Sequence, residues 1–202
     1  MRKSNWKWLF SILILMICNA TFASPLLLKS PDGNYEFSLQ HCDDGTGKHC
    51  LVRKGELIWS EAGGNQAGLV AGWSAGSDLL IFVEQDRMSL KLLSIKGENV
   101  TATKLDVQPL CKVGAAEVPY DWNAVGQGSI PHDLVKELKP LGKNTFGGVY
   151  LRAHYGIRVA VPFKLKIAVT SIGSVEAKYL IGKPRRLKKW SDEVPAYSEL
   201  AK

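Results

Sequence analysis

The chain has 202 residues, of which 22% are charged and 46% hydrophobic, and its formal net charge is +7. This length is enough for one domain with its own core. The charge is too small for a dedicated nucleic-acid-binding protein, so no nucleic-acid partner is expected.

The first 23 residues follow the three-part pattern of a secretory signal. Basic residues precede an apolar run from Trp8 to Cys18, and small and polar residues follow up to Ala23. The run is about half the ~20 residues that a membrane-spanning helix needs. We therefore expect removal of residues 1–23 and a single periplasmic or secreted domain at residues 24–202, with net charge +4 and no transmembrane segment.

Three cysteines remain after this removal. Cys42 and Cys50 enclose a loop with two glycines, which predicts a local disulfide of the kind common in exported domains. A metal site built from His41, Cys42, His49 and Cys50 is the alternative, but this spacing matches no zinc pattern. We therefore expect neither a metal nor another cofactor, and Cys111 is interpreted as a buried free thiol.

Alternating polar and apolar residues predict a mainly β, antiparallel fold. Tyr35, Phe37 and Leu39, for example, alternate with polar neighbours, and a turn at Lys54-Gly55-Glu56 predicts a hairpin. The expected strands are 35–40, the hairpin 51–59, 79–84, 90–95, 100–107, 149–155, 157–161, 165–170 and 175–181.

Two segments resemble the start of blades in TolB-type β-propellers. Ser30-Pro31-Asp32-Gly33 leads into an alternating strand, and Trp73-Ser74-Ala75-Gly76-Ser77-Asp78 does the same 43 residues later, counted from Gly33 to Gly76. The spacing is close to the ~40–45 residues of a four-stranded blade. The resemblance covers residues 27–107, and it implies a blade-like meander: a partial propeller or a β-sandwich.

Gly72-Trp73-Ser74-Ala75-Gly76 also satisfies the Gly-x-Ser-x-Gly pattern of a nucleophile elbow. A catalytic triad would combine Ser74 with Asp121 or Asp133 and with His132 or His154. However, the elbow requires a helix after the serine, and Leu79 to Val83 read as a strand. The glycine-rich turn of a β-meander is the preferred interpretation, and no catalytic residue is assigned.

Residues 109–148 have little periodicity and are predicted to form a long ordered loop, and loops of this length are often functional. Tyr120 and Trp122 in this loop are the candidate binding residues. Within it, Leu134, Val135 and Leu138 have helical spacing, which predicts one short helix at residues 131–139. A basic tail at residues 183–202 either contacts an anionic partner or is solvated.

In the absence of a convincing acid–base pair, metal cluster or phosphate loop, we expect a binding protein rather than an enzyme. The specific hypothesis is an envelope inhibitor: a periplasmic immunity protein that neutralises a cell-wall-degrading effector by protein–protein contact. The alternative is a small secreted serine hydrolase that uses Ser74. An accessory module of an envelope assembly complex is a third possibility, suggested by the blade-like repeat.

Overall fold

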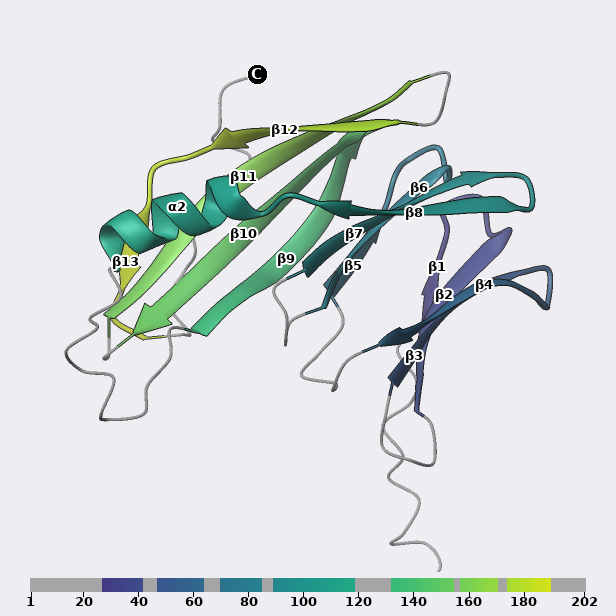
Figure 1. The fold of residues 1–202 in the computed structure, drawn as a ribbon, viewed down its shortest axis with the longest axis horizontal. Coiled ribbons are helices and arrows are strands. Elements are labelled where there is room, and N and C mark those ends of the chain that lie inside the picture. The colour runs from purple at the N-terminus through teal and green to yellow at the C-terminus, as the bar shows by residue number, and fades with distance from the viewer. Residues whose placement is uncertain are drawn as a thin grey trace, which may run out of the picture.

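The computed structural model describes residues 27–41, 47–63, 70–84, 89–118, 132–154, 157–170 and 174–189. In this part of the chain, strands form three antiparallel sheets and one short helix packs on the third sheet. Figure 1 shows the sheets following one another from the purple N-terminal sheet to the green and yellow C-terminal sheet. The predicted fold class, mainly β with antiparallel meanders and one short helix, is confirmed.

Each sheet contains a meander of four consecutive strands. Sheet A consists of β1 (Leu27–Lys29), β2 (Tyr35–His41), β3 (Gly47–Arg53) and β4 (Glu56–Gly63). Sheet B consists of β5 (Val70–Trp73), β6 (Leu79–Glu84), β7 (Ser89–Lys96) and β8 (Asn99–Leu105). Sheet C consists of β9 (His132–Gly142), β10 (Thr145–His154), β11 (Ile157–Val169) and β12 (Val175–Ile181), with β13 (Arg185–Leu187) paired to β11. The helix α2 (Gln108–Glu117) links sheet B to sheet C.

Sheet B is the central layer, and its two faces pack against different neighbours. Leu80 and Phe82 belong to the core shared with sheet A, where the rings of Phe37 and Phe82 lie 5.0 Å apart. Ile81 and Val83 belong to the core shared with sheet C. Successive residues of a strand point to opposite faces, so β6 is buried on both sides. This explains why the sequence from Leu79 to Val83 is continuously apolar.

The first strands of sheets B and C pack closely together. A side chain at Gly72 in β5 would place its Cβ 3.2 Å from the carbonyl oxygen of Leu138 in β9. Glycine at this position therefore allows the two backbones to approach each other. The first glycine of the Gly-x-Ser-x-Gly pattern thus has a packing role.

The helix predicted at residues 131–139 is wrong, because this segment is the strand β9. A register shift between Val149 and Tyr150 of β10 marks a bulge, across which Glu137 and Val135 are the paired residues. The extra residue, Lys136, puts Val135 and Leu138 on the same face although they are three positions apart. A bulged strand therefore imitates the spacing of a helix.

The long loop predicted at residues 109–148 is also wrong over most of its length. It contains most of α2, all of β9 and the start of β10, and residues 119–131 lie outside the described part of the chain. The sequence of α2 contains Gly114, which disfavours helix formation. A Cβ at Gly114 would lie 2.6 Å from the ring of Tyr150, so the glycine lets α2 sit directly on sheet C.

Strand β11 runs without interruption through Pro162, where two separate strands were expected. Pro162 pairs with Val149 on one side, and β12 begins to pair with β11 only at Phe163. The missing N–H of proline is tolerated because the ladder between β11 and β12 ends there.

Part of the predicted basic tail is structured, since β13 pairs with Arg158, Val159 and Ala160 of β11.

In the described part of the chain, no helix is long and apolar enough to cross a membrane. The described helix α2 is 10 residues long.

Candidate functional site

Ser30 and Ser74 occupy equivalent turns at the start of sheets A and B. Each hydroxyl donates to an aspartate, Asp32 at 2.6 Å and Asp78 at 2.8 Å. Each also accepts a backbone N–H five residues later, from Tyr35 and Leu79, at 3.0 Å. The two serines are 44 residues apart, so the turn repeats with the period of a blade.

The equivalent of Gly33 in the second turn is Ser77, not Gly76. Gly33 has φ of 72° and Ser77 has φ of 60°, and both backbones are therefore left-handed at this position. The two turns also touch, because the Asp32 N–H donates to the Ser77 hydroxyl at 3.1 Å. The aspartate has moved from the third position of the first turn to the fifth position of the second, which hides the repeat from a direct sequence match.

The environment of Ser74 is that of a structural turn. Ser74 is fully buried. Its hydroxyl donates a hydrogen bond to Asp78 and accepts one from the Leu79 N–H. The chain continues into β6, whereas a nucleophile elbow needs a helix whose N-terminus supports the oxyanion. This arrangement gives no support to the alternative serine hydrolase.

The main polar cluster of the described chain lies between α2 and sheet C. Arg152 and Asp133 are directly paired across β10 and β9, and the Arg152 NH1 group lies 2.9 Å from one carboxylate oxygen of Asp133 and 3.1 Å from the other. The Tyr150 hydroxyl donates to the same carboxylate at 2.5 Å. Arg152 is only 8% exposed and Tyr150 is fully buried, whereas the Asp133 side chain is 23% exposed, so solvent screens this cluster only in part.

Arg152 also fixes the end of α2. Its Nε donates to the carbonyl oxygen of Val118 at 3.1 Å. Val118 directly precedes segment 119–131, and Asp133 is the second residue after it. One buried guanidinium therefore holds both anchor points of the segment that carries Tyr120 and Trp122. We call Asp133, Tyr150, Arg152 and Val118 the arginine clamp.

Burial dominates the acid–base behaviour of the groups around the arginine clamp. Desolvation and the hydrogen bond to Asp133 raise the pKa of Tyr150 well above its ordinary value. Desolvation, with the nearby Asp133 charge, raises the pKa of the Cys111 thiol on α2. Desolvation likewise raises the pKa of Tyr179. A thiol with a raised pKa is a poor nucleophile at neutral pH, so the cluster is suited to holding structure rather than to covalent chemistry.

Of the candidate triad residues in the described part of the chain, Asp133 belongs to this cluster. His132 is exposed at the start of β9, and His154 is buried at the end of β10. Asp121 and the candidate binding residues Tyr120 and Trp122 lie outside the described residues.

The sequence interpretation missed Arg152. The sequence signal for it was an arginine two residues after Tyr150, on the face of the strand that points into the core. A buried cation requires a nearby carboxylate.

Cys42 also lies outside the described residues, so the disulfide with Cys50 stays a prediction. In the β2–β3 register, Cys50 pairs with Ser38, and His41, the last described residue before Cys42, pairs with Gly47. These two pairs are separated by three residues, or roughly 10 Å along the strands.

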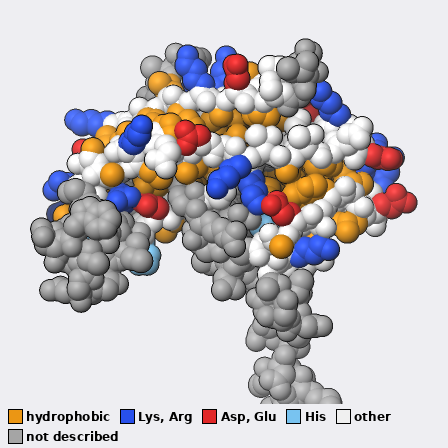
Figure 2. Space-filling view, viewed as in Figure 1, with side chains coloured by type: hydrophobic (Ala, Val, Ile, Leu, Met, Phe, Trp, Pro, Cys, Tyr) orange, Lys and Arg blue, Asp and Glu red, His pale blue; other side chains and the backbone are white. Residues whose placement is uncertain are grey.

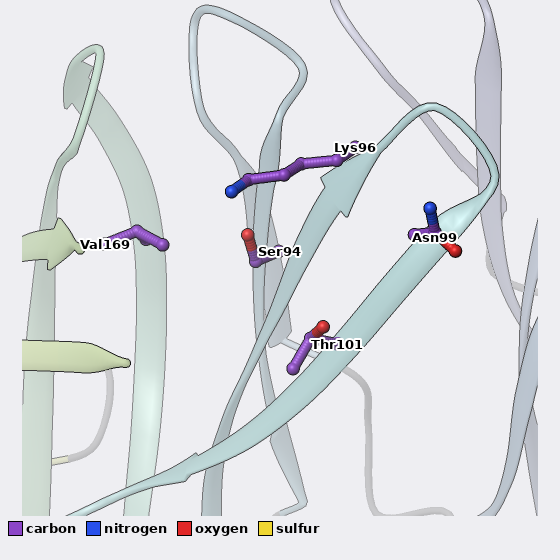
Figure 3. A pocket seen from close by; sticks show the side chains of 5 residues that line it. All are labelled: Ser94, Lys96, Asn99, Thr101 and Val169. Carbon is purple, nitrogen blue, oxygen red and sulfur yellow. The ribbon is translucent and has the colours of Figure 1, made fainter. Parts of the chain in front are cut away.

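A small pocket lies between the β7–β8 hairpin and the end of β11. Its volume is about 60 Å³, and its lining residues are Ser94, Lys96, Asn99, Thr101 and Val169. Figure 3 shows Val169 on the opposite side of the gap from the four polar residues. Pockets for organic ligands occupy about 300–1,000 Å³, so this one is too small to be a substrate site.

Among the described residues, no group of three or more His, Cys, Asp and Glu side chains could hold a metal.

Comparison with known proteins does not assign a family. No protein-family model matches the sequence, and no curated protein matches it. Among solved structures, the chain is similar to Hsv2 from Kluyvelomyces marxianus, with a TM-score of 0.38 and 14% identity. The match covers 80% of this chain and 48% of the Hsv2 chain, so this chain spans about half the length of that protein. Similarity at this level transfers no activity or partner.

Proposed function

We propose that this protein is an exported binding protein that inhibits its partner by protein–protein contact. In the specific form of this proposal it is a periplasmic immunity protein, and its partner is an effector that degrades the cell wall. Tyr120 and Trp122 are the proposed contact residues, since rigid aromatic side chains dominate the energy of many interfaces. The TolB-type resemblance of residues 27–107 belongs to this proposal, with the blade stack as the scaffold.

The observation that supports this proposal is the arginine clamp. Arg152 contacts Val118 before segment 119–131 and Asp133 after it. A binding segment with fixed ends loses less conformational entropy when it meets a partner than one with free ends. Arg152, Tyr150 and Val118 of the clamp are buried against α2 and sheet C, which suits a structural scaffold.

Inhibition can be measured directly. The purified protein is added to an envelope extract that degrades purified cell-wall sacculi, and the loss of turbidity is followed. We expect the protein to slow this loss, and we expect Trp122→Ala to weaken inhibition by on the order of 2 kcal/mol in affinity. The melting temperature of the variant is measured in parallel.

Two results would contradict the proposal. If the wild-type protein leaves degradation by its own host's envelope hydrolases unchanged, the immunity role is wrong. If Trp122→Ala strongly lowers the melting temperature, Trp122 is a core residue and not a contact residue. Leu57→Ala is the matched control, because Leu57 is a 56% exposed apolar residue on sheet A, away from the arginine clamp.

A further inference from the structure

The outer face of sheet C, opposite to α2, carries a group of lysines. Phe163, Leu165 and Ile167 of β11 are buried in the core, so the intervening Lys164 and Lys166 point to the other side of the sheet. Lys178 of β12 is directly paired with Lys166, and Lys139 of β9 is paired with Gly147, which pairs in turn with Lys164. We call Lys139, Lys164, Lys166 and Lys178 the lysine face.

Within the lysine face, the charges of the paired residues Lys166 and Lys178 are not offset by an ion pair in the described part of the chain. Two carboxylates share this side of the sheet: Glu137 forms an ion pair with Lys139, and Glu176 lies opposite Ala168 near the end of β11. Like charges directly opposite each other destabilise a sheet, so the Lys166–Lys178 pair is favourable only when something anionic lies against it.

The other end of the stack shows that such a pair is not a general property of this protein. On the outer face of sheet A, the cross-strand pair Lys29 and Glu36 has opposite charges, with a separation of 3.0 Å. Figure 2 likewise shows acidic and basic side chains interspersed on the visible face near the ends of sheets A and B. The like-charged pair is therefore a local feature of sheet C.

The residue types on the lysine face indicate the kind of anionic partner. Contact surfaces for proteins are enriched in arginine, tyrosine and tryptophan and depleted in lysine. Around the Lys166–Lys178 pair the basic residues are lysines, and Arg158 and Arg185 lie on the same side of the sheet toward β13. An ammonium is a point charge without the fork geometry that recognises individual carboxylates. Leu180, which is paired with Lys164, is 47% exposed on the same side. A flat array of lysines with one exposed apolar side chain fits a diffuse anionic surface that has an apolar layer beneath it.

We propose that the lysine face binds the surface of a bilayer that contains anionic phospholipid. The lysine ammonium groups lie among the phosphate groups, and Leu180 contacts the acyl boundary. This role is independent of the proposed inhibition. It places the outer face of sheet C against the membrane, while α2 lies on the opposite face of the sheet.

The test is co-sedimentation of the purified chain with vesicles of phosphatidylcholine, either alone or mixed with phosphatidylglycerol. We expect binding to the mixed vesicles only, and weaker binding as the salt concentration rises. The double variant Lys166→Glu/Lys178→Glu should bind the mixed vesicles on the order of tenfold more weakly or worse. The double variant Lys166→Gln/Lys178→Gln should lose less, because it removes positive charge without adding negative charge.

The matched control is Lys104→Glu/Lys112→Glu, which makes the same charge change on exposed residues of β8 and α2. It should bind mixed vesicles much as the wild type does. All variants are compared on the same chain, so any contribution from the N-terminal apolar run cancels, and thermal melting confirms that each is folded.

Several results would overturn the proposal. These are equal binding to both vesicle types, no binding at all, or equal losses for the control and the lysine-face variants. Binding to immobilised poly-glutamate with no binding to mixed vesicles would also overturn it, and would assign the face to an acidic macromolecule.

Discussion

Sheets A and B are built on one plan, whereas sheet C is built on another. Sheets A and B each have a serine turn between their first two strands. The two sheets are joined by contacts such as the hydrogen bond from the Trp73 indole N–H to the Leu28 carbonyl, at 3.1 Å. In the described chain, sheet C instead carries a helix on its inner face and an ion pair between the buried Arg152 and the partly buried Asp133. The comparison indicates that backbone turns order the repeated sheets, while a charged cluster orders the third.

The largest expected effect comes from breaking the arginine clamp. Arg152→Met leaves the Asp133 carboxylate and the Val118 carbonyl without their buried partner, and we expect a loss of roughly 3–5 kcal/mol in the free energy of unfolding. The double variant Arg152→Met/Asp133→Leu should recover part of this loss, because it removes the uncompensated charge. Urea unfolding measures both. A loss below about 1 kcal/mol for Arg152→Met would mean that the cluster does not order sheet C.

The serine turns provide the next test. Ser74→Ala removes the acceptor for the buried Leu79 N–H, and we expect a loss of about 1–3 kcal/mol. Ser30→Ala should lose less, because Ser30 is 5% exposed and Ser74 is fully buried. Thermal and urea unfolding of both variants measure the difference.

A fluorophosphonate probe should not label the wild-type protein, because the Ser74 hydroxyl is buried and hydrogen-bonded. Labelling that is lost in Ser74→Ala would instead establish Ser74 as a nucleophile.

Exchanging the charge patterns of the two end faces should have a smaller effect. Lys178→Glu creates an opposite-charge pair with Lys166, and we expect stabilisation by about 0.2–1 kcal/mol. Glu36→Lys creates a like-charge pair with Lys29 and should destabilise the protein by a similar amount. Urea unfolding at low salt measures both, and high salt should reduce both effects. If both variants change stability in the same direction, cross-strand charge is not the cause.

The smallest expected effect is the acid response of the first turn. Hydrogen bonds from Ser30 and Asn34 lower the pKa of Asp32 from 3.8 to about 2. Because the folded-state pKa is lowered, this stabilisation is fully present above the unfolded-state pKa and is lost as the pH falls through about 2. The group is largely solvent-exposed, so the effect on stability is modest. Asp32→Asn should flatten this part of the stability profile between pH values of about 4 and 2, and an unchanged profile would exclude Asp32 as its source.

Alternation in the sequence predicted much of sheets A and B, because their strands are short and regular. The prediction failed where local sequence was misleading: the bulge in β9 gave helical spacing, and Gly114 obscured α2. Pro162 appeared to end a strand that in fact continues, because its effect depends on which neighbouring ladder is present.

The candidate site could be predicted only in part. Asp133 was a candidate for the aspartate of a catalytic triad. Its partner in the structure, Arg152, is 19 residues away and is brought to it by the β9–β10 register. Residues that meet across strands cannot be paired without knowing that register. The lysine face was missed for the same reason, since Lys166 and Lys178 become neighbours only when β11 and β12 pair.

The burial of β6 on both faces has a consequence for how the chain is made. Leu79 to Val83 form an uncharged run with high β-propensity, the kind of segment that self-associates when exposed. One of its covering layers, sheet A, comes earlier in the chain, but the other, sheet C, comes later. This run therefore stays exposed until the C-terminal strands are complete. We expect protein that lacks these strands to aggregate through β6, and the full chain to depend on chaperones until synthesis ends.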